Sequence, residues 1–290
     1  MTSQILKGAD VAAKLNEENR QRAEALQHMG LTPTLGIIRV GEREDDLAYE
    51  RSALKRCANA GVAVKQYIFP ADVPEVEFLS KLRRIARDRS IHGCLIFRPL
   101  PKHIDDAKVC AILPLEKDVD GITPAAMSAL YAGTGGGFAP CTAQACIEML
   151  DHYQIPFAGK RVVVIGRSLV VGKPLAMLLM ARDATVMVCH SKTPDTAAIC
   201  RNADIVISAA GRAKMVGMRY MIPRHTVLDV GINVGEDGQL VGDVDFDAAS
   251  QVVHAVSPVP GGVGTVTCSV LVRHVIEAAE RRAAKLLIKK

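Results

Sequence analysis

The fold is decided by the segment VVVIGRSLVVGKP, residues 162–174. A run of β-branched residues ends at Gly166, and a helix is expected to begin close to Pro174, because proline in the first helical turn loses no hydrogen bond. Such a junction brings free backbone N–H groups and the positive end of the helix dipole to one point, where a pyrophosphate can bind. The segment therefore predicts a dinucleotide-binding α/β unit; an ordinary tight turn between strand and helix is the alternative.

The spacing within this segment excludes two better-known motifs. Five residues separate Gly166 from Gly172, where a P-loop has four, and Pro174 follows Lys173, where a P-loop has Ser or Thr. The segment also departs from G-x-G-x-x-G. After the next predicted strand, residues 190–193 (HSKT) contain no Asp or Glu to bind the ribose hydroxyls of NAD. Their donors suit a 2′-phosphate and favour NADP; a solvated polar loop is the alternative.

The rest of the chain alternates predicted strands and helices, a pattern typical of parallel sheets covered by helices. In the first half we predict strands at 34–40, 62–69 and 93–97, with helices at 10–30, 46–60 and from 74 onward. In the second half we predict strands at 161–165, 184–189, 204–208 and 226–230, with helices at 142–152, 173–181 and 195–201. The glycine-rich residues 133–140 form the predicted linker, and a final helix at 265–287 is expected to return to the first domain.

Composition and charge exclude several classes of protein. The 290 residues carry 36 Lys and Arg against 31 Asp and Glu, and the small net charge of +5, with 4% aromatic residues, argues against a nucleic-acid surface. The eight cysteines contain no Cys-x-x-Cys pair, so a zinc site is not supported. Neither a signal peptide nor an apolar run of the ~18 residues that span a membrane is visible. We expect a reduced, cytoplasmic protein with no metal and no membrane or nucleic-acid partner.

Two further loops combine glycine with residues that could serve a site. In Asp118-Val119-Asp120-Gly121, a carboxylate beside glycine is usually a turn or a helix cap, but it could also accept two hydrogen bonds from the N–H edge of a pterin. Residues 258–264 (PVPGGVG) form a rigid turn that lets backbone approach a ligand closely, or else a connector between domains. The residues alone do not choose between these alternatives.

Taken together and in this order, the segments resemble the bifunctional methylenetetrahydrofolate dehydrogenase/methenyltetrahydrofolate cyclohydrolase family over essentially the whole chain. The matching motifs lie at residues 117–121, 166–168, 171–174, 229–233, 241–244 and 258–264. Residues 140–142 (PCT) match as well, although the proline that follows in the family is Ala143 here.

The resemblance implies two α/β domains with parallel sheets, the second Rossmann-like, with the substrate cleft between them. The implied folate-binding domain is 1–140 plus 270–290, the implied NADP-binding domain is 141–269, and the implied assembly is a homodimer. The resemblance also implies oxidation of 5,10-methylenetetrahydrofolate by NADP⁺, followed by hydrolysis of the methenyl product to 10-formyltetrahydrofolate.

Individual residues match the family's functional positions. Tyr49 and Asp120 match the catalytic and substrate-binding Tyr and Asp, of which the Asp holds the pterin. The implied cofactor contacts are Gly166, Arg167, Ser168, Ser191 and Ile232. The loop that borders the implied cleft contributes Pro260, Gly261 and Gly262 to substrate binding.

Two positions depart from the family pattern. The catalytic Lys, four residues after Tyr49, is Ala53, and the Gln that partners this Lys is Phe97. Lys55 is no substitute, because six residues at ~100° each turn it about 120° away from Tyr49 around a helix. Arg56 lies about 10 Å along the helix axis, and its guanidinium cannot act as a base at neutral pH.

Loss of both partners predicts that the two half-reactions are affected differently. Hydride transfer mainly needs the reacting carbon and the nicotinamide held in near-attack geometry, whereas hydrolysis needs water activated and protons moved. We expect dehydrogenase activity to be partly kept and cyclohydrolase activity to be weak or lost, with Arg98 a candidate specificity residue for an anionic group. The alternatives are an NADP-dependent reductase of another imine-like or pterin-related substrate, or a non-catalytic folate- or dinucleotide-binding paralogue.

Overall fold

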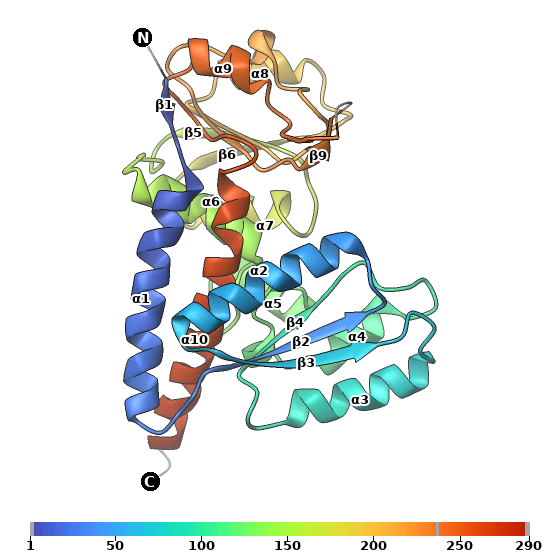
Figure 1. Cartoon of the computed structure of the whole chain (residues 1–290). Coiled ribbons are helices and arrows are strands. Elements are labelled where there is room, and N and C mark those ends of the chain that lie inside the picture. The colour runs from blue at the N-terminus through green and yellow to red at the C-terminus, as the bar shows by residue number, and fades with distance from the viewer. Residues whose placement is uncertain (1–2, 236–237, 288–290) are drawn as a thin grey trace. The chain divides into compact units, whose positions relative to one another are not determined.

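The computed structural model describes residues 3–235 and 238–287. Contacts within the chain divide it into two units: unit 1 is Met1–Ala13 with Thr142–Thr267, and unit 2 is Lys14–Cys141 with Cys268–Lys290. Both have parallel sheets (Figure 1). The predicted domain boundaries differ from this division at the amino terminus, and residues 288–290 of the predicted first domain lie outside the described residues.

Unit 1 is built on a six-stranded sheet in the order β1-β11-β8-β7-β5-β6, with every pairing parallel. Its strands are β1 (Gln4–Ile5), β5 (Arg161–Ile165), β6 (Thr185–Cys189), β7 (Ile205–Ser208), β8 (Thr226–Asp229) and β11 (Ala255–Val256). Its helices are α6 (Cys141–His152), α7 (Gly172–Met180), α8 (Thr196–Arg201) and α9 (Phe246–Val252). The antiparallel pair β9 (Asn233–Val234) and β10 (Leu240–Val241) stands apart from the sheet.

The amino-terminal strand corrects the predicted first domain. β1 pairs in parallel with β11, so residues 1–13 belong to unit 1 rather than to the domain predicted at 1–140. Each of these strands is only two residues long, too short for an alternating or apolar run to reveal it in the sequence. The four longer strands of this sheet lie where they are predicted, to within one residue at either end.

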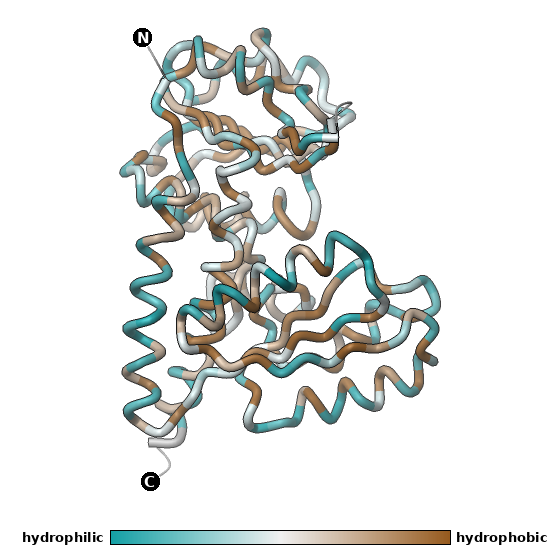
Figure 2. Tube along the Cα trace, viewed as in Figure 1, coloured by the Kyte–Doolittle hydropathy of each residue, from teal (hydrophilic) through white to brown (hydrophobic). Residues whose placement is uncertain are grey.

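Unit 2 contains a three-stranded parallel sheet in the order β3-β2-β4. Its elements are most of α1 (Gly8–His28), β2 (Thr34–Val40), α2 (Glu44–Ala60), β3 (Ala63–Phe69), α3 (Glu75–Arg87), β4 (Gly93–Ile96), α4 (Asp106–Ile112), α5 (Pro124–Ala132) and α10 (Thr267–Leu287). Residues 8–13 of α1 are assigned to unit 1. Figure 1 shows α2 and α3 on opposite faces of this sheet. Hydrophobic and hydrophilic residues alternate along α3 in Figure 2, because its apolar stripe packs into a core with the strands.

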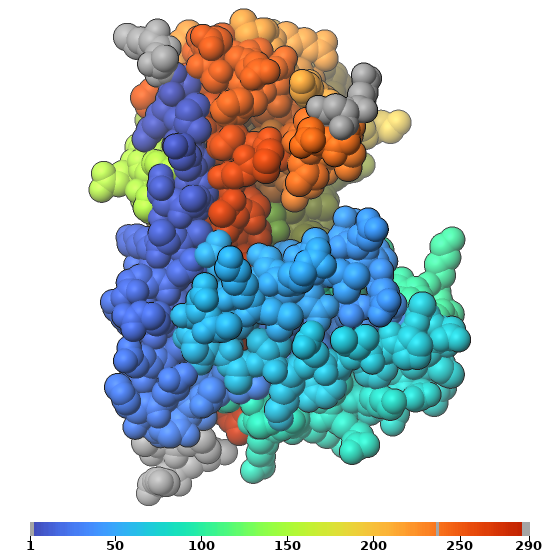
Figure 3. Space-filling model, viewed as in Figure 1, coloured from blue at the N-terminus to red at the C-terminus, as the bar shows by residue number. Residues whose placement is uncertain are grey.

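A buried ion pair fixes α2 to the sheet. Arg39 of β2 and Glu50 of α2 are each 4% exposed, and their Nε and Oε2 atoms lie 2.8 Å apart. Gln66 of β3 donates a second hydrogen bond, of 2.6 Å, to Oε1 of Glu50. Two strands therefore hold one carboxylate on the inner face of α2, while the outer side chains of the helix remain on the surface (Figure 3).

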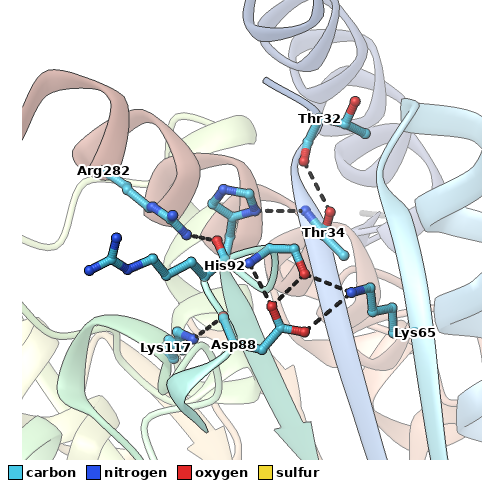
Figure 4. Close-up of polar contacts among 9 residues, drawn as sticks. Thr32, Thr34, Lys65, Asp88, His92, Lys117 and Arg282 are labelled. Carbon is cyan, nitrogen blue, oxygen red and sulfur yellow. Dashed lines mark hydrogen bonds and ion pairs between the residues drawn. The ribbon is translucent and has the colours of Figure 1, made fainter. Parts of the chain in front are cut away.

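Polar contacts join α10 to the turn that leads into β4 (Figure 4). Lys117 Nζ donates to the carbonyl of Asp88 at 2.7 Å, and Arg282 of α10 donates to the carbonyl of Arg89. His92 Nδ1 accepts from the backbone N–H of Thr34, at the start of β2. The final helix thus packs within unit 2, together with the segment Lys14–Cys141.

Among the described residues, no helix has both the length and the apolar character needed to cross a bilayer.

Candidate functional site

The predicted cofactor contacts of unit 1 all follow strands at one edge of the sheet. β5, β6 and β8 run parallel, and Gly166, Ser191 and Ile232 come shortly after their carboxyl ends. β5 lies between β6 and β7. After β5 the chain forms β6 on one side of it, and then crosses over to form β7 on the other side. In open α/β sheets, ligands bind at the carboxyl edge at such a switch point.

The turn after β5 leaves no room for a side chain at its glycines. Gly166 has φ +125°, and a Cβ on it would lie 2.3 Å from the carbonyl oxygen of Ala209. A Cβ on Gly172 would lie 2.1 Å from the carbonyl oxygen of Gly166. Arg167 and Ser168 are exposed at this turn, and no side chain caps α7. Bare backbone at a helix start, beside an exposed guanidinium, fits the pyrophosphate of a dinucleotide.

The segment after β6 offers donors but no carboxylate. Ser191 and Lys192 are exposed, and the backbone N–H of Lys192 donates to His190 Nδ1 at 3.2 Å. Thr193 Oγ1 accepts from the N–H of His190 at 3.0 Å and closes the turn. A hydroxyl and an ammonium on a fixed turn suit a 2′-phosphate better than the free ribose hydroxyls of NAD.

Two buried carboxylates organise the remaining loops at this edge. Asp229 accepts backbone N–H bonds from Gly231, Asp243 and Val244 at 2.8–3.0 Å, and burial raises its pKa to about 6. A Cβ on Gly242 would lie 1.8 Å from Asp229 Oδ2, so position 242 has no room for a side chain.

The second carboxylate, Asp243, is fully buried and receives five hydrogen bonds. The donors are Ser208 Oγ, the backbone N–H groups of residues 210, 211 and 212, and the side-chain amide of Asn233. Sequence reasoning noted both motifs that contain these Asp residues but assigned them no role. Their signals differ: Asp229 ends a buried strand two residues before Gly231, and Asp243 directly follows Gly242.

The predicted loop at residues 258–264 also belongs to unit 1. The N–H of Gly8 donates to the carbonyl of Gly261 at 2.8 Å, and a Cβ on Gly262 would lie 2.3 Å from the carbonyl of Pro258. Pro260 and Gly261 are exposed. The structure thus places Pro260, Gly261 and Gly262 in unit 1, whereas Tyr49 and Asp120 belong to unit 2.

In unit 2, Tyr49 and the two departures from the family pattern lie together. The rings of Tyr49 on α2 and Phe97 after β4 meet edge to face, with centroids 6.0 Å apart and planes at 82°. Ala53, one helical turn after Tyr49, is fully buried. Phe97 is 8% exposed. The positions of the family's Lys and Gln are therefore occupied by apolar groups beside the phenol.

Two alternatives were considered for the carboxylates of residues 118–121, a turn cap and a ligand contact. Asp118 fits the first and Asp120 the second. Asp118 is fully buried and accepts from the N–H groups of Ile122 and Thr123, at 3.0 and 2.8 Å, so it serves as a turn cap. Asp120 accepts from the N–H of Cys141 through Oδ1 at 3.1 Å. Burial raises the pKa of Asp120. Asp120 is thus the carboxylate of this loop that is left with acceptor capacity for a ligand.

Buried thiols complete the surroundings of Tyr49. Burial, together with the thiols of Cys268 and Cys141 and the carboxyl of Asp120, raises the pKa of the phenol well above its usual value. Burial likewise raises the pKa of Cys141 far above the ordinary range, so this thiol is protonated at neutral pH. The carboxyl of Asp120 thus acts electrostatically on the Tyr49 phenol within unit 2. Sequence reasoning considered the cysteines only as possible zinc ligands and missed this neighbourhood.

Arg98 follows Phe97 and forms an ion pair with Asp106 of α4. The side chain of Arg98 is 33% exposed and that of Asp106 is 44% exposed. The guanidinium thus has a carboxylate partner at the surface of unit 2.

Comparison with known proteins decides the family. Residues 6–120 match the family model of the tetrahydrofolate dehydrogenase/cyclohydrolase catalytic domain, and residues 140–283 match that of the NAD(P)-binding domain. The chain belongs to this family. The bifunctional protein FolD of Clostridioides difficile is 44% identical over 277 residues, which cover 96% of each chain. That of Carboxydothermus hydrogenoformans is 46% identical over 277 residues, 95% of this chain and 96% of the relative.

Solved structures agree with this assignment. The bifunctional FolD dehydrogenase/cyclohydrolase of Campylobacter jejuni has a TM-score of 0.94 and 35% identity, over 97% of this chain and 99% of its own. The Trypanosoma brucei methylenetetrahydrofolate dehydrogenase-cyclohydrolase, solved with NADP cofactor and inhibitor, has a TM-score of 0.91 and 34% identity, over 98% and 99%. Family membership and fold class, predicted from the sequence motifs, are thereby confirmed.

The close packing of Gly242 against Asp229 predicts that one added methyl group destabilises the protein. Gly242→Ala forces a Cβ into a carboxylate held by three backbone N–H bonds, and we expect a loss of about 1–3 kcal/mol in the free energy of unfolding. Gly217→Ala is the matched control, because open space surrounds a Cβ there. Urea denaturation of both variants measures the difference. Equal stability of the two variants would contradict a rigid Asp229.

Proposed function

We propose that the chain oxidises 5,10-methylenetetrahydrofolate with NADP⁺ and that its hydrolysis of the methenyl product is weak or lost. The observation that carries the proposal is the neighbourhood of Tyr49, where Asp120 is kept and Ala53 and Phe97 replace the Lys and Gln of the family. The Trypanosoma brucei relative, whose structure contains NADP, supports the choice of cofactor.

Each unit would contribute a separate part of the chemistry. Gly166, Arg167 and Ser168 would hold the pyrophosphate, Ser191 would lie at the 2′-phosphate, and Ile232 would be a further cofactor contact. NADP⁺, when bound, supplies the hydride acceptor. Asp120 would accept hydrogen bonds from the N–H edge of the pterin, and Tyr49 would pack against the folate. Pro260, Gly261 and Gly262 stay predicted substrate contacts.

Hydride transfer does not depend strongly on the Lys and Gln that are missing at positions 53 and 97. It needs the donor carbon held in near-attack geometry, and no side chain must give or take a proton. Hydrolysis needs an activated water and a proton donor, which contribute about 10²–10⁴-fold in rate. Ala53 and Phe97 can do neither, and the Tyr49 phenol, with its pKa raised by burial, stays protonated at neutral pH. The geometry therefore supports the first half-reaction without the second.

The direct test measures both half-reactions in purified protein. We expect NADPH to form from NADP⁺ and 5,10-methylenetetrahydrofolate, and 10-formyltetrahydrofolate to form from the methenyl compound at about the spontaneous rate, because the general base is missing. Hydrolysis at the rate of a bifunctional relative would contradict the proposal. If no NADPH forms, the chain is instead a reductase of another pterin-like substrate, detected by NADPH consumption, or a binding protein.

Restoring the two missing groups should restore hydrolysis. The double variant Ala53→Lys with Phe97→Gln returns an ammonium and an amide to the neighbourhood of Tyr49, and we expect its cyclohydrolase rate to rise at least ~10²-fold. Ala53→Met with Phe97→Leu is the control, since it changes volume without adding a proton donor or acceptor. A gain in the control, or none in the double variant at unchanged stability, would show that other groups limit hydrolysis.

We further propose that the chain is a homodimer, as the family resemblance implies. β6 is an edge strand of the unit 1 sheet and carries no charged residue, which is the kind of edge that pairs with another chain. Val188 on it is 39% exposed, and nearby Met180 at the end of α7 is 54% exposed. Cytoplasmic location stays a prediction of the sequence.

A charge on this edge should separate the subunits. We expect light scattering to give a dimer mass for the natural chain and a monomer mass for Val188→Lys, because an edge lysine opposes pairing. Val76→Lys, at a 78% exposed position on α3 of unit 2, is the control and should remain dimeric. A monomeric natural chain would refute the dimer, and a dimeric Val188→Lys would place its interface elsewhere.

A further inference from the structure

Two guanidinium groups flank the loop that follows β4. Arg98 begins this loop and pairs with Asp106. Arg43, at the start of α2, donates from Nη1 to the carbonyl of Pro99 at 3.5 Å. Its own carboxylate neighbour, Asp45, is 4.0 Å away and 94% exposed. Two cations from different elements thus lie on one short segment.

This segment adjoins the proposed folate contacts. Phe97, whose ring touches Tyr49, immediately precedes Arg98. Arg98 is thus one residue away from the aromatic contact with Tyr49, and its positive charge also acts on the carboxyl of Asp120. An anionic extension of a ligand held by Tyr49 and Asp120 would therefore meet Arg98 on its way to solvent.

We propose that Arg98 and Arg43 bind the carboxylates of the glutamyl tail of a folate and select tails with several glutamates. This inference rests on the proposed function. Each further glutamate adds one carboxylate, and a guanidinium offers a planar fork of donors that matches a carboxylate in two parallel hydrogen bonds. Two such forks on one segment suit a repeating carboxylate chain.

The carboxylate of Asp106 marks the position beside Arg98 that a tail carboxylate would occupy. Asp106 already presents this group to Arg98, in a pair whose side chains are 33% and 44% exposed. Exposed ion pairs contribute little free energy, so a tail carboxylate can displace Asp106 at small cost. Asp106 therefore acts as a competitor for the same guanidinium, and its removal should favour the substrate.

The test compares kcat/KM for methylenetetrahydrofolate with one and with three glutamates. We expect the natural chain to prefer the triglutamate by about tenfold, a typical gain from charge-assisted hydrogen bonds, and the preference to shrink at high salt. Arg98→Gln and Arg43→Gln should each reduce the preference at least ~3-fold, and Asp106→Asn should increase it ~2-fold, since a competitor is removed. Arg51→Gln, an exposed arginine elsewhere on α2, is the matched control and should keep it.

The outcomes separate this inference from the proposed function. Equal kcat/KM for the two substrates, or an unchanged preference in a stable Arg98→Gln variant, overturns the tail site while dehydrogenase activity stands. If neither substrate is oxidised, calorimetry with mono- and triglutamyl tetrahydrofolate decides. Tighter triglutamate binding that Arg98→Gln abolishes then supports the tail site, and equal binding refutes it. A loss of preference in Arg51→Gln as well would assign the effect to the general surface charge and refute the site.

Discussion

The carboxyl edge of the unit 1 sheet depends on two carboxylates that have no access to solvent. Asp229 and Asp243 together gather N–H groups from the loops after β7 and β8 and from the segment after β10. A buried carboxylate without such donors would be costly, and loops of bare backbone without such acceptors would not keep one conformation. Each group thus stabilises the other, and the loops that face a dinucleotide are shaped before any ligand binds.

Unit 2 shows the opposite use of burial. Around Tyr49 the structure gathers an aromatic ring, a methyl group and protonated thiols, and the ionisable groups there are shifted toward their neutral forms. Such a surface can orient a folate and exclude water but cannot exchange protons readily. The family architecture is therefore retained, and the weak hydrolysis that we propose would follow from two side chains rather than from a change of fold.

Much of this could be predicted from the sequence because strong local signals agree with the final packing. The β-branched run before Gly166 is a strand because it is buried on both faces, and Gly61 ends α2 in the left-handed conformation that glycine adopts without strain. The features that could not be predicted depend on contacts that local sequence patterns do not reveal. β1 is a strand only because it pairs with β11, which itself pairs with β8 on its other side. The role of Asp118 as a cap depends on N–H groups four and five residues away. Cys141 is the last residue of the first segment of unit 2 and Cys268 is the first residue of the second, and no spacing in the chain reveals that both act on Tyr49.

The ion pair between Arg39 and Glu50 has a consequence for how this chain can change over evolutionary time. Loss of either partner alone would strand a charge inside unit 2, whereas replacement of both by apolar residues would remove the desolvation cost as well as the attraction. The two positions are therefore expected to vary together or not at all. Because Glu50 directly follows Tyr49, the ion pair also restricts the rotation of α2 about its own axis. It thereby restricts the direction from which a substrate can approach the phenol.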